Sequence, residues 1–226
     1  MVERDVTHVI FDVDGLLLDT EKLYDVVTQE IVGPYGKRFD WSVKVKMMGR
    51  PPPQSAQILV NELQLPMTNM EFLDKAKAGF ARHFPTANLM PGVERLVRHL
   101  YNHGIPMALA TGSSATDYDD KITKHRDLFR LFSHVVTGDD PSVKNGKPAP
   151  DVFLTAASRF STPPLEMSHV LVFEDAPNGI AAAKCAGMWT VMVPDARIDP
   201  QMTKEAHLVI KTLDEFDPQA WGLPSF

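Results

Sequence analysis

The segment His8-Val9-Ile10-Phe11-Asp12-Val13-Asp14-Gly15 decides how this chain can fold. Its apolar, β-branched start predicts a buried parallel strand, with Asp12 and Asp14 at the carboxyl end of that strand. Open α/β sheets bind their ligands at this end of their strands. Gly15 predicts a sharp turn that can bring Asp14 around toward Asp12. Two carboxylates this close repel each other, which raises the pKa of one of them or attracts a cation.

The pair of Asp12 and Asp14 has two interpretations. A carboxylate nucleophile, a neighbouring acid or base and a hard metal ion would each use such a pair directly. The alternative is a strand followed by a turn that an aspartate caps, without any chemistry. This segment taken alone leaves both interpretations open.

A second apolar run, residues 108–113, also predicts a strand that ends in polar residues. Thr111 and Ser113 offer hydroxyl groups, and the loop around Gly112 frees backbone N–H groups at the start of a helix, which together suit a phosphate oxygen. The alternative is that these residues only cap the next helix.

Two further segments carry charge. Lys147 directly follows the turn pair Asn145-Gly146, so it is either held at a site where it balances carboxylates or exposed on a loop. Glu174 and Asp175 end a third strand pattern at residues 170–175, and carboxylate oxygens suit Mg²⁺. Asp175 as a plain helix cap is the alternative there. Four such sites in one chain are hard to explain as four accidents.

Taken in this order, the four segments resemble the four motifs of the haloacid dehalogenase superfamily, in its phosphatase branch. The resemblance implies that Asp12 is the nucleophile and Asp14 the general acid and base. It also implies that Thr111 binds phosphate, with Gly112 and Ser113 beside it.

Further roles follow from the same resemblance. It makes Lys147 the charge-balancing lysine at the phosphate. The implied cofactor is Mg²⁺, held by the carboxylates of Asp12 and Asp175 and the main-chain carbonyl of Asp14, with Glu174 as a further candidate ligand. Crowding by Asp12 and Asp175 would favour a protonated Asp14, although Mg²⁺ works against that.

The order of predicted elements indicates an α/β fold with an insertion. From Pro91 onward, helix and strand patterns alternate, which predicts a parallel sheet with helices on both faces. No convincing strand occurs between Asp19 and Asn88, where an amphipathic pattern ends at Gly33-Pro34 and Thr68 to Glu71 form a capping box. We expect a Rossmann-like three-layer α/β/α core from residues 1–18 and 89–226. Residues 19–88 then form the inserted helical cap that the resemblance implies.

The first cap helix begins next to Asp14, so Thr20, Glu21 and Tyr24 are the cap residues best placed to reach a substrate. Glu21 could accept hydrogen bonds from a ribose or base, and Tyr24 could stack on a ring. The alternatives are a helix-dipole acid and a packing residue. A closer resemblance within the family, carried by residues 11–24 and 170–188 among others, implies pseudouridine 5′-phosphate as the substrate.

Composition limits the partners. The net charge of −6 and the lack of a basic run argue against binding of a nucleic acid polymer. One cysteine in 226 residues fits a reducing compartment, and neither a signal peptide nor a membrane-spanning apolar run is seen. We expect a cytoplasmic monomer that binds a small-molecule phosphate monoester and does not bind a membrane.

These observations predict a Mg²⁺-dependent phosphomonoesterase that forms an aspartyl-phosphate. A sugar-phosphate phosphatase or a phosphomutase could use the same core residues and stays an alternative. A dehalogenase fits less well, because Asp14 is there to protonate a leaving alkoxide. The non-enzyme alternative is a catalytically inactive binding protein.

Overall fold

A parallel sheet forms the centre of the fold in the computed structural model, which describes residues 5–47 and 52–226. Within these residues the six strands follow the order β3-β2-β1-β4-β5-β6, and every neighbouring pair is parallel. The strands are β1 (His8–Phe11), β2 (Met107–Ala110), β3 (Val135–Val136), β4 (Val170–Glu174), β5 (Trp189–Met192) and β6 (Leu208–Val209).

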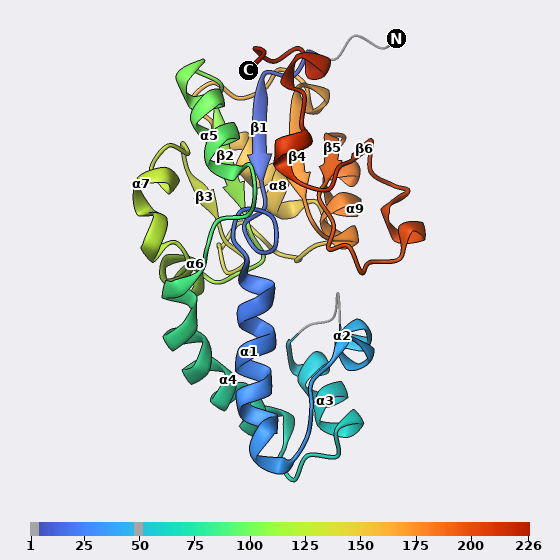
Figure 1. Cartoon of the computed structure of the whole chain (residues 1–226). Helices are drawn as coiled ribbons and strands as arrows, with labels where there is room; N and C mark the ends of the chain where they lie inside the picture. The colour runs from blue at the N-terminus through green and yellow to red at the C-terminus, as the bar shows by residue number, and fades with distance from the viewer. Residues whose placement is uncertain (1–4, 48–51) are drawn as a thin grey trace.

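Helices cover both faces of this sheet, as the alternation of elements predicts (Figure 1). Side chains alternate along a strand, so Val9 and Phe11 of β1 enter one apolar cluster while Ile10 enters the other. The core helices are α5 (Val93–Asn102), α6 (Ala115–Lys121), α7 (Arg126–Phe129), α8 (Asp151–Ser158) and α9 (Pro177–Cys185). The first cluster includes residues of α5 and α7, and the second includes residues of α8 and α9.

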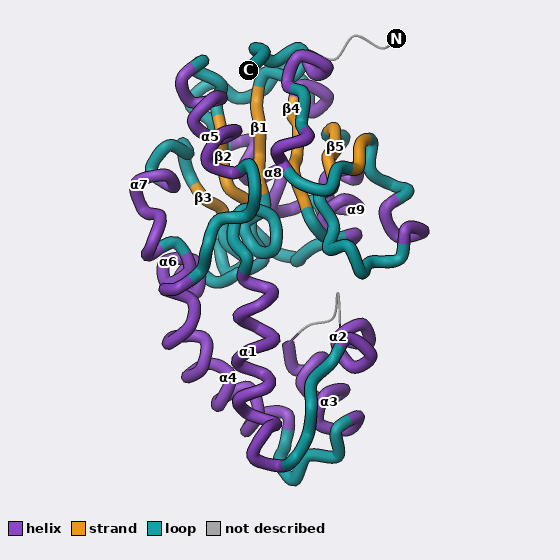
Figure 2. The backbone as a smooth tube through the Cα atoms, viewed as in Figure 1, coloured by secondary structure: helices purple, strands orange, loops and turns teal. Residues whose placement is uncertain are grey.

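The segment between β1 and α5 is helix and loop wherever the structure describes it (Figure 2). It forms α1 (Thr20–Val32), α2 (Trp41–Met47), α3 (Pro52–Glu62) and α4 (Asn69–His83). These helices enclose their own apolar cluster, which includes Val27, Leu59 and Phe72. The sequence pattern around Val43 to Met48 also predicts a helical stretch, and Met48 lies outside the described residues.

Local signals explain where these cap helices start and stop. The Thr68 hydroxyl accepts the Glu71 N–H while the Glu71 carboxylate accepts the Thr68 N–H, so the predicted capping box at α4 is confirmed. Helix α1 ends at Val32, directly before Gly33-Pro34. The two connections to the core meet where Leu18 bridges Leu89, and the domain boundaries at residues 19 and 88 stay a prediction.

The strands run toward the cap, so their carboxyl ends face it (Figure 1). This arrangement puts the loops after β1, β2 and β4 between the sheet and the cap. In the part of the chain that the structure describes, no helix has both the length and the apolar content needed to cross a membrane.

Candidate functional site

Three neighbouring strands deliver the predicted site residues to one edge of the sheet. Phe11, the last residue of β1, pairs with Leu109 in β2 and with Phe173 in β4. The residues that follow these positions are therefore brought together although they are far apart in sequence. They include Asp12, Thr111 and the pair Glu174-Asp175.

Lys147 lies at the centre of one cluster of charges. Its Nζ atom is 2.5 Å from Asp12 Oδ1 and 2.6 Å from Glu174 Oε1, and it also donates to the Ala110 carbonyl at 3.1 Å. The ammonium lies 4.8 Å from the centre of the Phe153 ring, and only 13% of the Lys147 side chain is exposed. The alternative of an exposed loop lysine is therefore wrong.

The nucleophile predicted from the sequence, Asp12, is buried among these charges. Burial raises the pKa of Asp12 to about 7; the Lys147 ammonium opposes this rise, and the charges of Glu174 and Asp14 add to it. A neighbouring cation favours the ionised form of such a buried carboxyl, and Lys147 supplies one.

Asp14 belongs to a second cluster, in which its carboxylate accepts four hydrogen bonds. Thr20 Oγ1 and Lys121 Nζ donate to Oδ1 at 2.8 and 2.6 Å. Ser113 Oγ and Thr111 Oγ1 donate to Oδ2 at 2.7 and 3.3 Å. Burial would raise the pKa of Asp14, but the Lys121 ammonium and the hydroxyl donors outweigh it and hold this pKa below its usual range.

The expectation of a protonated Asp14 is therefore wrong for this structure. The carboxylate is directed at Lys121 and the hydroxyl groups, which stabilise its charged form. The crowding that was expected to protonate Asp14 instead acts on Asp12 and Asp175.

Lys121 is the functional candidate that sequence reasoning missed. It ends α6, its side chain is 1% exposed, and its ammonium reaches Asp14 from 107 positions away in the sequence. A signal existed, because Tyr118, Lys121 and Ile122 share the i, i+3, i+4 face of a helix that packs inward. A lysine on such a face needs a buried anionic partner.

The hydroxyl segment after β2 lies against Asp14. Thr111 is fully buried, and its hydroxyl accepts a hydrogen bond from the Ser113 N–H at 3.0 Å. Gly112 is exposed, and nothing lies within 4 Å of where its Cβ would be. The structure brings these three residues to the site, and their binding of phosphate stays a prediction.

The two acids after β4 differ in their surroundings. Glu174 uses both oxygens, because Oε1 holds Lys147 and Oε2 accepts the N–H groups of Asp175 and Ala176 at 2.9 Å. The Asp175 carboxylate has no hydrogen-bond or ion-pair partner within residues 5–47 and 52–226. Burial raises the pKa of Asp175 well above its usual value, and the charges of Glu174, Asp12 and Glu21 add to this effect.

This set of charges fits a hard divalent cation. Lys147 pairs with Asp12 and Glu174, and Asp175 lies near this pair without a donor of its own, so the cluster has an excess of negative charge. Carboxylate oxygens are the protein ligands that Mg²⁺ prefers. Among the described residues, no three His, Cys, Asp or Glu side chains form a metal-binding group together. A site with two carboxylates and a main-chain carbonyl does not need a third side chain.

The two cap residues predicted to touch substrate have different environments. Glu21 lies beside the turn at Gly15, with its Cγ atom 3.5 Å from where a Cβ of that glycine would be, and it pairs with Lys44 at 2.9 Å. The Tyr24 ring packs edge-on against Phe80 and Phe84, and its hydroxyl accepts a hydrogen bond from Lys121. These contacts favour the packing interpretation of Tyr24 over stacking on a substrate.

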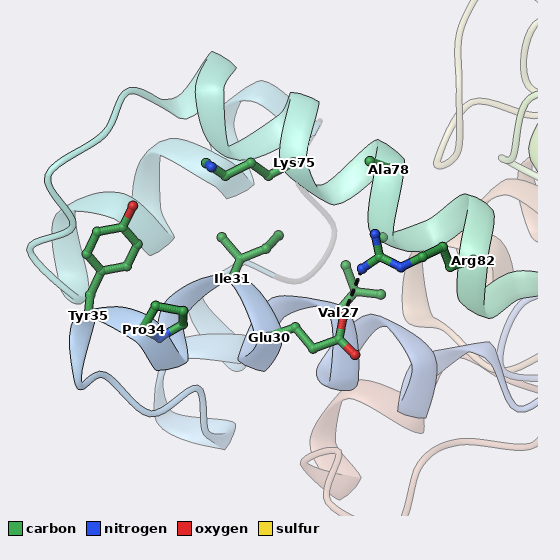
Figure 3. A pocket seen from close by; sticks show the side chains of 9 residues that line it. Val27, Glu30, Ile31, Pro34, Tyr35, Lys75, Ala78 and Arg82 are labelled. Atoms are coloured by element: carbon green, nitrogen blue, oxygen red, sulfur yellow. Dashed lines mark hydrogen bonds and ion pairs between the residues drawn. The ribbon is translucent and has the colours of Figure 1, made fainter.

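The cap also holds a pocket of about 390 Å³ between α1 and α4. Figure 3 shows Glu30 of α1 and Arg82 of α4 joined across it, with the apolar side chains of Val27 and Ile31 nearby. None of the predicted site residues lines this pocket. The candidate active site is therefore the cluster at the edge of the sheet.

Comparisons with known proteins agree with this geometry. Residues 9–193 match the family described as haloacid dehalogenase-like hydrolase. The chain is 51% identical to (DL)-glycerol-3-phosphatase 2 of Arabidopsis thaliana, over 98% of this chain and 93% of that protein. It is 48% identical to a Drosophila melanogaster protein named "Probable pseudouridine-5'-phosphatase", over 100% of this chain and 97% of that one.

A solved structure shows the same fold. The crystal structure of a HAD family hydrolase from Deinococcus radiodurans, with bound phosphate and sodium, matches with a TM-score of 0.81. The match covers 99% of this chain and 100% of that one at 20% sequence identity, which bears on the fold alone. Together the comparisons confirm the predicted family resemblance and fold class.

Proposed function

The chain belongs to the haloacid dehalogenase-like hydrolase family and is a phosphomonoesterase, and on that premise we propose that it is Mg²⁺-dependent and forms an aspartyl-phosphate on Asp12. The observation that carries this proposal is the buried Asp12 carboxylate, 2.5 Å from Lys147 at the carboxyl end of β1. A carboxylate held beside a fixed cation can attack a dianionic phosphate that would otherwise repel it.

In the first step, the phosphoryl group is transferred from the ester to Asp12, and several residues of the chain contribute to it. An Asp12 oxygen attacks phosphorus, and the bond from phosphorus to the ester oxygen breaks. Lys147 holds Asp12 in place and offsets the charge of the incoming phosphate, and Glu174 holds Lys147. Mg²⁺, bound by the Asp12 and Asp175 carboxylates and the Asp14 carbonyl, would neutralise charge on the transferring phosphoryl group. Glu174, whose oxygens accept hydrogen bonds from Lys147 and from two backbone N–H groups, holds that lysine and is a further candidate ligand.

Asp14 carries the proton transfers. The leaving oxygen takes a proton from Asp14, and Asp14 then accepts a proton from the water that attacks the aspartyl-phosphate, releasing phosphate and restoring Asp12. The hydrogen bonds that favour the ionised form of Asp14 suit the second step. The first step needs Asp14 to have taken up a proton before the ester bond breaks.

The substrate that we propose first is pseudouridine 5′-phosphate, which gives pseudouridine and phosphate. Its support is the similarity to the Drosophila protein over the whole chain. Glycerol 3-phosphate is the second candidate, and two observations favour it. The Arabidopsis relative, which is 51% identical to this chain, is named for that substrate. The Tyr24 ring also packs against Phe80 and Phe84, so it is not free to stack on a base.

The test is phosphate release with Mg²⁺ from pseudouridine 5′-phosphate, uridine 5′-phosphate, glycerol 3-phosphate and a glucose phosphate. We expect either pseudouridine 5′-phosphate or glycerol 3-phosphate to have the highest kcat/KM. The ester with the higher value is then the better candidate for the substrate. Asp12→Asn keeps the shape of the nucleophile, and its activity should fall to background. Conversion between sugar phosphates without phosphate release would point to a phosphomutase instead.

Two further expectations belong to this proposal. The partner is a small-molecule phosphate monoester, and the support for it is that the similar proteins of Arabidopsis and Drosophila are named as phosphatases of such esters. We also infer a cytoplasmic monomer that binds neither a membrane nor a nucleic acid polymer. Light scattering of the purified protein tests its oligomeric state.

A further inference from the structure

A second buried lysine, Lys121, has no role in the reaction described above. We propose that Lys121 is a positioning residue, which fixes the Asp14 carboxylate from the core side and ties that position to the cap through the Tyr24 hydroxyl. The proposal rests on the proposed function, because it assigns Asp14 the proton transfers.

The contacts of Lys121 account for its whole ammonium group. Nζ donates to Asp14 Oδ1 at 2.6 Å, to Ser113 Oγ at 2.7 Å and to Tyr24 Oη at 3.1 Å. An ammonium has three N–H donors, so each of them is used. Ser113 donates in turn to the other Asp14 oxygen at 2.7 Å. Lys121 therefore restrains both carboxylate oxygens, one directly and one through Ser113.

The surroundings of Lys121 exclude direct contact with a substrate. Its side chain is 1% exposed, and its Nζ atom lies 4.4 Å from the centre of the Phe84 ring and 5.4 Å from that of the Tyr24 ring. A phosphate could reach Nζ only by displacing Asp14 or Ser113. Any effect of Lys121 on the reaction must therefore pass through the groups that it holds, which are Asp14, Ser113 and Tyr24.

The cluster joins the two parts of the chain. Lys121 and Ser113 come from the core, whereas Tyr24 comes from α1 and Phe84 from the 3-10 turn after α4. Thr20, the first residue of α1, adds a cap hydroxyl to the same Asp14 oxygen that Lys121 holds. The Asp14 carboxylate is thus placed by both parts at once, and its geometry depends on how the cap sits.

Three substitutions separate positioning from binding and from folding. Lys121→Met removes the ammonium and keeps an unbranched apolar stem. Lys121→Arg keeps the charge but replaces the compact donor with a planar fork that cannot make the same three bonds. Tyr24→Phe removes one acceptor and keeps the ring against Phe80 and Phe84. Lys77→Met, at an exposed position on α4, is the matched control.

The expected loss is in kcat. Lys121→Met should lower kcat about 100-fold with KM nearly unchanged, because positioned proton transfer contributes a factor of this size. Tyr24→Phe should lower kcat about threefold to tenfold, the worth of one hydrogen bond. Lys121→Arg should lie between these two variants, and Lys77→Met should match the wild type.

The decisive measurement uses p-nitrophenyl phosphate, whose leaving group departs without a proton. With an impaired Asp14, the first step proceeds and hydrolysis of the aspartyl-phosphate becomes slow. Rapid mixing of Lys121→Met should then show a burst of nitrophenol equal to the enzyme, followed by a slow steady rate. The thermal unfolding midpoint of each variant is measured alongside, and Lys121→Arg and Tyr24→Phe carry the test if Lys121→Met does not fold.

Several outcomes would overturn the positioning role. A raised KM with unchanged kcat would make Lys121 a binding residue. A loss of activity that follows the folded fraction, equal for alkyl and aryl esters and without a burst, would make it structural. Unchanged activity in all three variants, with an active wild type, would remove this proposal and leave the phosphatase intact. A wild type that releases no phosphate, or an active Asp12→Asn variant, would end both proposals.

Discussion

A Cβ atom at Gly179 would stand 1.7 Å from the Oε1 atom of Glu174. Glycine at this position therefore leaves space at the start of α9 for the carboxylate that holds Lys147. The same carboxylate accepts the N–H groups of Asp175 and Ala176 as the chain turns into α9. The ion pair and the beginning of the helix thus depend on the absence of one methyl group.

We expect Gly179→Ala to damage both stability and activity. The added methyl must displace the Glu174 carboxylate, and disturbing a buried ion pair in a packed site should cost about 3 kcal/mol. Urea unfolding gives the change in stability, and phosphate release gives the change in activity. Gly33→Ala is the control, since its new Cβ would meet only the Gln29 side chain, at 3.5 Å. Equal stability of the two variants would contradict this interpretation of Gly179.

Mg²⁺ should bind more tightly as the pH rises through neutrality. Without the metal, the pKa of Asp12 is about 7, so below that pH a proton occupies the carboxyl and competes with Mg²⁺. The dissociation constant should fall by up to about tenfold for each unit of pH below this pKa and become constant above it. Calorimetric titration of the metal-free protein with MgCl₂ across neutral pH checks this. A constant affinity across the range would show that Asp12 ionises well below neutrality or is not a ligand.

Much of the fold follows from local pattern. The apolar runs that became β1, β2 and β4 are buried along their whole length, and such runs predict strands well. The helix α1 and the capping box of α4 have equally clear signals. Strand β6 has only two residues and was not predicted from the sequence. So short a segment shows no alternation of apolar and polar residues, and its pairing with β5 is what defines it as a strand.

The site residues could be predicted from the sequence where a polar or charged side chain follows the end of a predicted strand. Asp12, Thr111 and Glu174 occupy such positions, and the register of the sheet brings them together. Lys121 was not found, because a single lysine on a helix usually projects into solvent and its partner Asp14 is distant in sequence. The charge state expected for Asp14 was wrong for the same reason, since the missing ammonium decides it.

Asp14→Asn should slow both steps of the reaction while substrate still binds. The amide cannot supply or accept the proton, so kcat should fall about 10²- to 10⁴-fold with little change in KM. The thermal midpoint should also fall, because the buried Lys121 loses its anionic partner. Steady-state kinetics and a melting curve on the same sample check both effects. A large increase in KM with kcat preserved would instead give Asp14 a binding role.

Lys147→Met should cost stability as well as activity. The ammonium is largely buried between Asp12 and Glu174, so its removal leaves two adjacent carboxylates without a cation and should destabilise the fold by about 3–5 kcal/mol. Added Mg²⁺ should restore part of that stability, because it places positive charge beside Asp12, but it should not restore turnover. Lys144→Met is the matched control on the same loop, since Lys144 is exposed and its ammonium donates to the Pro141 carbonyl, whereas its backbone N–H, which donates to Asp151, is unchanged by the substitution. Urea unfolding with and without Mg²⁺, followed by phosphate release, measures each effect. A Lys147→Met variant as stable as Lys144→Met would mean that Asp12 and Glu174 do not share one buried cation in solution.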